Sequence, residues 1–413
     1  MRLNLNNSAA YAWLVVGLLW PVALLNYLDR QMLSSIRMSM RADIPSIAND
    51  QDFGTLMAVF MWVYALLSPV GGYVADRFNR RWTVIGSLLV WSAVTWLTGH
   101  MHTFSQMLWC RAAMGISEAF YMPAALALIV DYHTGPTRGR AVGMHQSGIY
   151  CGLALGGIGG YIAQTGSWRD CFTWFGVAGV LYSVVLMLLL RNAVKPGDSP
   201  MSRPPAVTVR GTLRALWTNP SFALLVAYFT LPAIAGWMMK NWLPTFLADT
   251  FHLKAGPAGL SATGYIQIAS LIGVLAGGCV ADYWMRRRQR GRIYTSATGV
   301  LLLAAALAGL GWSTSLGAAI LCMILFGLGW GFFDGNNMPI LCQITRPEHR
   351  ATGYGLMNLV SISVGAGATV VLGWMRDQGI HFTLAFTGAA AVALLSIGLI
   401  LFVKPQVPFP KPI

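Results

Sequence analysis

Long apolar runs separated by short polar segments follow one another along almost the whole chain. Each run can cross a bilayer as a helix, which requires roughly 20 apolar residues. The runs lack the alternation of polar and apolar positions that is typical of membrane-spanning strands. Since backbone groups in lipid are satisfied only in helices and closed barrels, the pattern predicts an all-α polytopic membrane protein. We place twelve transmembrane helices at residues 11–35, 53–75, 82–100, 104–131, 140–164, 171–191, 219–246, 257–283, 293–312, 316–343, 351–375 and 382–403.

We expect the first run to remain as a transmembrane helix rather than to be removed as a signal peptide. It is longer than the apolar segment of a signal peptide and lacks a small-residue cleavage site. It also carries Asp29 and Arg30 near its outer end.

Composition agrees with the apolar pattern. Of the 413 residues, 56% are hydrophobic and only 10% are charged, whereas a soluble domain carries about 25% charged residues. The six cysteines are scattered without a CxxC pair, so we interpret them as packing residues and expect no metal and no cofactor.

The net charge of +14 raises the question of nucleic acid, but the basic residues gather in every second loop. By the positive-inside rule this asymmetry puts both termini in the cytoplasm. The basic loops then face anionic lipid, so we expect membrane lipids and no nucleic acid among the partners.

The chain divides into two similar halves. The longest polar stretch, 192–218, is predicted to be a cytoplasmic linker between a six-helix bundle at 1–191 and another at 219–413. Gly71-Gly-Tyr-Val-Ala-Asp76 returns as Gly277-Gly-Cys-Val-Ala-Asp282, and each copy ends an even-numbered span. Glu118 and Asp334 occupy matching places before a Met-Pro pair. Six helices separate the partners, which predicts parallel repeats.

A few ionisable residues lie inside predicted spans, where each costs about 2.5–3.5 kcal/mol on insertion scales. They are Asp29, Arg30, Arg111, Glu118, Lys240 and Asp334. Arg111 and Glu118 share one helix face but lie about 10 Å apart along the axis, too far for direct contact. The alternative to a functional role is a set of neutralised packing pairs, and Lys240 is close enough to a helix end to reach the interface.

The loop Gly72-Tyr-Val-Ala-Asp76-Arg77-Phe-Asn79-Arg80-Arg81 resembles the signature of the major facilitator superfamily. It departs at Asn79, where glycine is usual, and Asn is the next best residue for a positive φ. Asn26-Tyr-Leu-Asp29-Arg30 and Arg111-Ala-Ala-Met-Gly-Ile-Ser-Glu118 are similar to motifs of the anion:cation symporters, the hexuronate, galactonate and sialin-like carriers. The Spinster-like branch of lipid exporters is the alternative.

The resemblance implies roles for several of these residues. Arg30 would bind the anion and Glu118 would carry the coupling proton, with Asp29 and Asp334 as further proton candidates. The expected substrate-binding set is completed by Tyr27, Tyr64, Arg111, Gln146, Lys240 and Asn358. The expected gating motif consists of Gly72, Asp76, Arg77, Arg80 and Asp282. The alternative role of these residues is to determine the membrane topology.

These features together predict a monomeric secondary transporter in the plasma (inner) membrane. We expect proton-coupled symport of a small organic anion, such as a sugar acid, by rocker-switch alternating access. A Spinster-like carrier of lysolipid, an uncoupled or Na⁺-coupled carrier and a channel remain alternatives. An enzyme is not expected, because the sequence has no HExxH motif and no nucleophile elbow.

Overall fold

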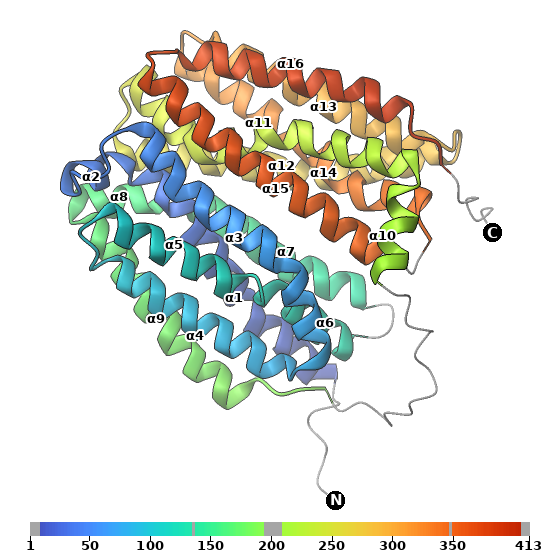
Figure 1. Cartoon of the computed structure of the whole chain (residues 1–413), viewed down its shortest axis with the longest axis horizontal. Coiled ribbons are helices and arrows are strands. Elements are labelled where there is room, and N and C mark those ends of the chain that lie inside the picture. Colours follow the sequence, from blue (N-terminus) through green and yellow to red (C-terminus); the bar gives the residue numbers. More distant parts are fainter. Residues whose placement is uncertain (1–8, 134–136, 194–208, 347–348, 406–413) are drawn as a thin grey trace, which may run out of the picture. The chain divides into compact units, whose positions relative to one another are not determined.

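The computed structural model describes residues 9–133, 137–193, 209–346 and 349–405, without the side chains of Asp76, Arg77 and Val209 (Figure 1). Helices make up nearly all of this part of the chain, which contains no strand. The helices are α1 (Ala9–Ser35), α2 (Arg37–Asp43), α3 (Asp50–Arg77), α4 (Arg80–Thr98), α5 (Phe104–Glu118), α6 (Tyr121–Tyr132), α7 (Arg138–Leu155), α8 (Ile158–Thr165), α9 (Trp168–Leu189), α10 (Val209–Trp217), α11 (Pro220–Phe251), α12 (Ala255–Met285), α13 (Gly291–Gly311), α14 (Leu316–Ile344), α15 (Arg350–Asp377) and α16 (Phe382–Leu401).

Every predicted span coincides with helix. Ten helical segments of the described residues are long and apolar enough to cross a membrane. The other two predicted spans are α4 and the pair α7–α8. Helix α4 is rich in Ser, Thr and Trp, which lowers its hydropathy. The predicted span that corresponds to α7 and α8 is interrupted at Gly156 and Gly157. The short helices α2 and α10 were not predicted, and α10 lies inside the stretch expected to be a linker.

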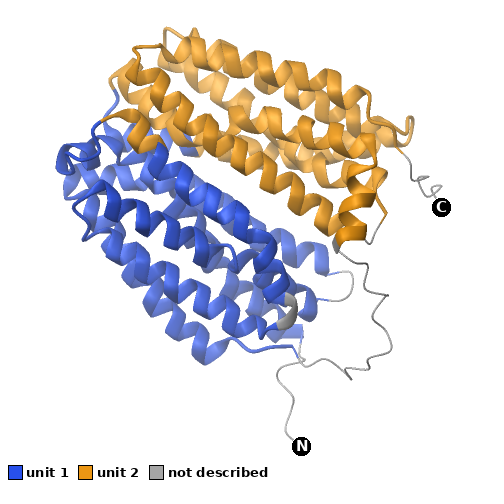
Figure 2. Cartoon of the chain, viewed as in Figure 1, with its two compact units in different colours: residues 1–48, 55–203, 253–263 blue, residues 49–54, 204–252, 264–413 orange. Residues whose placement is uncertain are grey.

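The chain forms two compact units (Figure 2). Unit 1 comprises residues 1–48, 55–203 and 253–263, and unit 2 comprises residues 49–54, 204–252 and 264–413. The units therefore follow the two halves of the sequence except at two helix starts. The first residues of α3 belong to unit 2, and the first residues of α12 belong to unit 1.

Both units use the same helix pairings. In unit 1, α1 packs along α7 and α4 packs along α9. In unit 2, the equivalent helices pair in the same way, α11 with α15 and α13 with α16. The shared pairing is what parallel repeats require, because matching apolar faces bury against matching partners.

Small residues let these helices approach closely. A methyl group added at Gly152 of α7 would lie 2.3 Å from the Leu24 carbonyl of α1. One added at Gly148 would lie 2.8 Å from the Trp20 carbonyl. The glycines of α7 thus bring two backbones together, which is their usual role in membrane helices.

The start of α3 is held within unit 2 by α15. The Asp377 carboxylate accepts hydrogen bonds from the backbone N–H groups of Asp50 and Gln51, both at 2.8 Å. The first N–H groups of a helix lack partners of their own, so this carboxylate caps α3 from another helix. Arg376 adds ion pairs to Asp50 at 2.7 Å and to Asp249 at 2.6 Å.

Candidate functional site

An ion pair joins the charged residues of α1 and α5 in unit 1. Arg30 Nε donates to Glu118 Oε2 at 2.5 Å, although the two residues lie 88 positions apart in the sequence. The side chain of Glu118 is completely buried and that of Arg30 is 13% exposed. Two charges at this depth are tolerated because each is the counterion of the other.

Three aromatic rings surround the guanidinium of Arg30. Its Cζ lies 4.7 Å from the ring centroid of Tyr27, 4.9 Å from that of Phe60 and 4.4 Å from that of Tyr64. Phe60 and Tyr64 occupy successive turns of α3 and stack on each other with centroids 5.9 Å apart. The rings face a cation with their negative faces, which attracts the charge without neutralising it.

The ion pair leaves hydrogen-bonding capacity unused. Arg30 Nη2 and Glu118 Oε1 are buried and have no hydrogen-bond partner among the described residues. Asn26, one turn before Arg30 on α1, is also completely buried. Arginine can bind a carboxylate or phosphate through two parallel hydrogen bonds, so the site has an unfilled donor for an anionic group.

Arg111 lies close to this cluster but is held differently. Its Nε donates to the Leu56 carbonyl at 3.3 Å, and its Cζ lies 4.7 Å from the ring centroid of Phe60. Phe60 therefore contacts both arginines. Among the described residues Arg111 forms no ion pair with a carboxylate, although Glu118 and Asp29 interact with it electrostatically.

Asp29 makes its own hydrogen bond, to a residue of α4. Its Oδ2 accepts a hydrogen bond from Thr95 Oγ1 of α4 at 3.3 Å, and its side chain is buried. Successive residues on a helix point about 100° apart, so Asp29 and Arg30 serve different neighbours. Asp29 therefore has a hydrogen-bond partner outside the ion pair, while Glu118 and Arg111 still interact with it electrostatically.

A break in the fourth span positions Glu118. Helix α5 ends at Glu118 and α6 begins at Tyr121. Pro123 has no N–H to offer the Ala119 carbonyl four residues earlier, and its ring disfavours a continuous helix there. Gly71 of α3 fits against this break, where an added methyl group would lie 2.2 Å from the Ala119 carbonyl.

A second glycine brings the aromatic residues of α3 to α5. A methyl group on Gly115 would lie 2.8 Å from the Phe60 carbonyl and 3.2 Å from the Tyr64 amide nitrogen. The close approach of α3 and α5 therefore depends on this position, and it sets the aromatic pair beside the Arg30 guanidinium.

Unit 2 contains a related group of charges and rings. Lys240 Nζ of α11 lies 4.7 Å from the ring centroid of Trp237 and 5.3 Å from that of Trp330. Lys240 also interacts electrostatically with Asp334 of α14. The ammonium is thus held among aromatic rings rather than extended to a helix end.

Two predicted polar residues make no such contacts. Gln146 of α7 and Asn358 of α15 are both half-buried and have no hydrogen bond among the described residues. Gln146 belongs to unit 1 and Asn358 to unit 2. The neighbour of Gln146, His145, is completely buried and hydrogen-bonded to Tyr121 at 2.9 Å, which makes it a packing residue.

The loop motif supports ion pairs within each unit. Arg80 pairs with Asp131 of α6 and donates to the Ala75 carbonyl at 3.2 Å. In the second copy, Asp282 pairs with Arg292 at 2.5 Å. Gly72 has open space where a side chain would begin. The side chains of Asp76 and Arg77 lie outside the part of the chain that the structure describes.

The prediction of a positive φ at Asn79 is wrong. Asn79 has φ −67° and ψ 108° and is the N-cap of α4, where its side chain accepts from the Trp82 N–H at 3.3 Å. Asn is favoured at this position because its side-chain oxygen satisfies a free N–H of the first helical turn. The same side-chain oxygen also accepts a hydrogen bond from Asn192 Nδ2 at 2.8 Å.

Sequence reasoning missed the residues that surround the charges. Phe60, Thr95, Trp237 and Trp330 are all apolar or weakly polar residues in apolar runs, where nothing sets them apart from lipid-facing positions. One signal was present, since Phe60 and Tyr64 are four residues apart and must share a helix face.

The chain matches the family model described as Major Facilitator Superfamily over residues 19–369. Its relatives include protein spinster of Drosophila melanogaster, which is 29% identical over 74% of this chain and 52% of that protein. The chain thus spans about half the length of the fly protein. Spinster homolog 1 of Bos taurus is 29% identical over 90% of this chain and 74% of that protein.

A solved structure with the same fold is a bacterial homolog of the human lysosomal transporter spinster, in an inward-facing and unoccupied conformation. It superimposes with a TM-score of 0.77 at 20% identity, over 96% of this chain and 95% of that chain. At this identity the likeness concerns the fold.

Proposed function

The chain belongs to the Major Facilitator Superfamily, and on that premise we propose that it is a spinster-like carrier that couples an amphiphilic organic anion to protons. Membership makes it a multi-pass secondary transporter rather than an enzyme. The relatives favour the spinster branch, which the sequence had offered as the alternative, over the anion:cation symporters. We further propose that it acts as a monomer in the plasma membrane.

The observation that carries the proposal is the buried pair of Arg30 and Glu118 at 2.5 Å. An acidic group of the substrate that binds the unfilled Nη2 of Arg30 brings a second negative charge to the guanidinium, and it thereby displaces Glu118 from part of its contact. The displaced carboxylate is then a buried charge without a counterion, which is costly until it takes up a proton. Substrate binding and protonation of Glu118 thereby favour each other, and by linkage the effect is reciprocal.

The surroundings of Arg30 favour an amphiphile over a hydroxylated sugar acid. Three aromatic rings line the guanidinium, and only Tyr27 and Tyr64 among them carry a hydroxyl group. Aromatic walls bury apolar surface well but satisfy few hydroxyl groups. A substrate with one acidic group and an apolar portion matches this combination.

The test is uptake into proteoliposomes with an imposed pH gradient, using lysophosphatidylglycerol, palmitate and glucuronate as labelled probes. We expect the wild type to accumulate an amphiphilic anion and to ignore glucuronate. Glu118→Gln removes the titrating group while keeping the shape, so it should abolish gradient-driven accumulation but retain counterflow. Arg30→Lys should lose most binding, because an ammonium cannot replace the planar fork.

Arg169→Lys is the matched control, since Arg169 pairs with Asp43 at 2.8 Å away from this cluster. Its transport should equal that of the wild type. Accumulation by Glu118→Gln in response to the gradient would place the proton elsewhere. Preference for glucuronate would return the protein to the sugar-acid class.

A further inference from the structure

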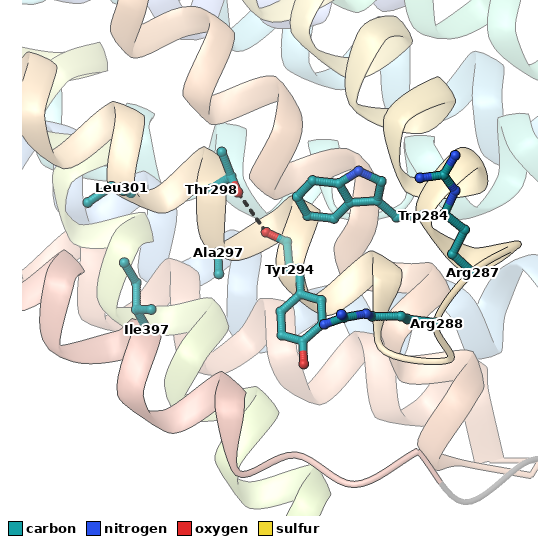
Figure 3. A pocket seen from close by; sticks show the side chains of 8 residues that line it. All are labelled: Trp284, Arg287, Arg288, Tyr294, Ala297, Thr298, Leu301 and Ile397. Atoms are coloured by element: carbon teal, nitrogen blue, oxygen red, sulfur yellow. Dashed lines mark hydrogen bonds between the residues drawn. The ribbon is translucent and has the colours of Figure 1, made fainter.

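A pocket of about 730 Å³ lies in unit 2 at the hairpin that joins α12 to α13, with one wall from α16 (Figure 3). The lining residues are Trp284 from the end of α12, Arg287 and Arg288 from the turn after it, Tyr294 and Leu301 from α13, and Ile397 from α16. None of these residues belongs to the Arg30 or Lys240 clusters. The volume is in the range of pockets that hold small molecules.

The pocket is charged and aromatic at one end and apolar at the other. Figure 3 shows the two arginines beside Trp284 and Tyr294, and Leu301 and Ile397 on the opposite side. Tyr294 and Leu301 are seven residues apart, so they share a face of α13 and lie about 10 Å apart along its axis. The lining therefore changes from cationic to hydrocarbon over the length of a lipid headgroup and upper acyl chain.

The two arginines of the pocket differ from their neighbours Arg290 and Arg292. Arg292 pairs with Asp282 at 2.5 Å, and Arg290 donates to the Leu401 carbonyl at 3.3 Å. Arg287 stacks on Tyr283 with 4.6 Å from Cζ to the ring centroid. Arg287 and Arg288 are exposed, and neither has a carboxylate partner in the described ranges.

From this arrangement we propose that the pocket binds an anionic glycerophospholipid of the membrane leaflet that contacts this hairpin. Its phosphate lies between Arg287 and Arg288, its glycerol region contacts Trp284 and Tyr294, and an acyl chain follows Leu301 and Ile397. Tryptophan and tyrosine favour the headgroup level of a bilayer, and basic residues there attract anionic lipid. The apolar wall favours a lipid over a soluble phosphate, which has no chain to cover it.

The experiment measures the thermal stability of the delipidated protein in a neutral detergent as lipid is added. Dioleoylphosphatidylglycerol should stabilise the wild type in a saturable manner, whereas dioleoylphosphatidylcholine and soluble glycerol 3-phosphate should not. The combined change Arg287→Ala and Arg288→Ala should weaken the phosphatidylglycerol affinity about thirtyfold, or about 2 kcal/mol at 1.4 kcal/mol per tenfold.

Arg286→Ala is the matched control, because Arg286 is an exposed neighbour of the same charge that does not line the pocket. It should keep the wild-type affinity. Leu301→Trp gives a second, independent variant, since it fills the apolar end without changing any charge, and it should also abolish the effect.

Three results would overturn the proposal. Equal weakening by Arg286→Ala would reduce the effect to the general charge of the hairpin. Stabilisation by glycerol 3-phosphate equal to that by the lipid would indicate a site for a soluble phosphate. Unchanged phosphatidylglycerol affinity in Leu301→Trp would show that no acyl chain occupies the pocket.

Discussion

The Arg30–Glu118 pair makes a quantitative prediction about stability. Replacing Arg30 with Met keeps an apolar stem of similar length among the three rings but leaves the completely buried Glu118 carboxylate without its counterion. Removing one member of a buried pair costs about 3–5 kcal/mol, so we expect Arg30→Met to lower the free energy of unfolding by about 4 kcal/mol.

The reciprocal change is milder. In Glu118→Gln the amide oxygen still accepts from Arg30, and the guanidinium keeps its three aromatic neighbours, each contributing about 0.5–2 kcal/mol. We therefore expect Glu118→Gln to lower the free energy of unfolding by about 1 kcal/mol. The double variant has neither charge and leaves only a neutral amide to satisfy, at about 1–2 kcal/mol.

The double variant should consequently be more stable than Arg30→Met alone. The summed losses in free energy of unfolding of the two single variants should exceed the loss in the double variant by about 3 kcal/mol. This difference corresponds to roughly a hundredfold in the folding equilibrium. The measurement is reversible unfolding in mixed micelles with increasing dodecyl sulfate, followed by tryptophan fluorescence.

The control cycle uses Arg169 and Asp43, whose side chains are 21% and 48% exposed. A partly exposed pair of this kind should couple by less than about 1 kcal/mol. Additivity of the Arg30 and Glu118 changes within about 0.5 kcal/mol would refute the reasoning, because the two charges would then not depend on each other.

Three further predictions follow from local geometry. Gly115→Leu should push α3 from α5 and abolish transport, whereas Gly86→Ala, where an added methyl group meets nothing within 4 Å, should be tolerated in the same uptake assay. Asn79→Ala should lower unfolding stability by about 1 kcal/mol through loss of the cap and Asn79→Gly by only a few tenths; a gain of stability in Asn79→Gly would instead support the positive-φ turn, where glycine is the favoured residue. In a cysteine-free background, cysteine at Arg288 should label only from the cytoplasm and cysteine at Gln51 only from outside.

The spans were predictable because lipid imposes one rule on every residue of a run. A segment without enough apolar length cannot cross, so every apolar run coincides with helix, and only the short helices α2 and α10 lie outside the runs. Interruptions inside a run were harder to foresee. The break after Glu118 depends on Pro123, and prolines at 21, 69, 232 and 244 lie inside continuous helices, so proline alone does not decide.

The partner of each buried charge was not predictable from the sequence. Helical spacing indicated that Asp29 and Arg30 face different neighbours, and they do. Which neighbour each one meets depends on the rotation of α1 against α4 and α5, and that is set by close contacts such as Gly115 against Phe60. The residue type indicates that burying the charged side chain costs free energy, whereas only the packing shows which group neutralises the charge.

The two charged clusters occupy equivalent positions in the two halves of the chain and have a similar composition. Arg30 and Lys240 each lie roughly six turns into the first long helix of their unit, and Glu118 and Asp334 occupy matching places in a later helix. Each unit thus carries a cation among aromatic rings and a nearby carboxylate, with opposite charges that offset each other. A carrier must change conformation without ligand, and an uncompensated charge in lipid would oppose that step. Unit 1 uses the planar fork of arginine in a direct pair, and unit 2 uses the point charge of lysine against two tryptophans. We therefore expect directional recognition of an acidic group in unit 1, and Asp334→Asn should change substrate affinity more than proton coupling.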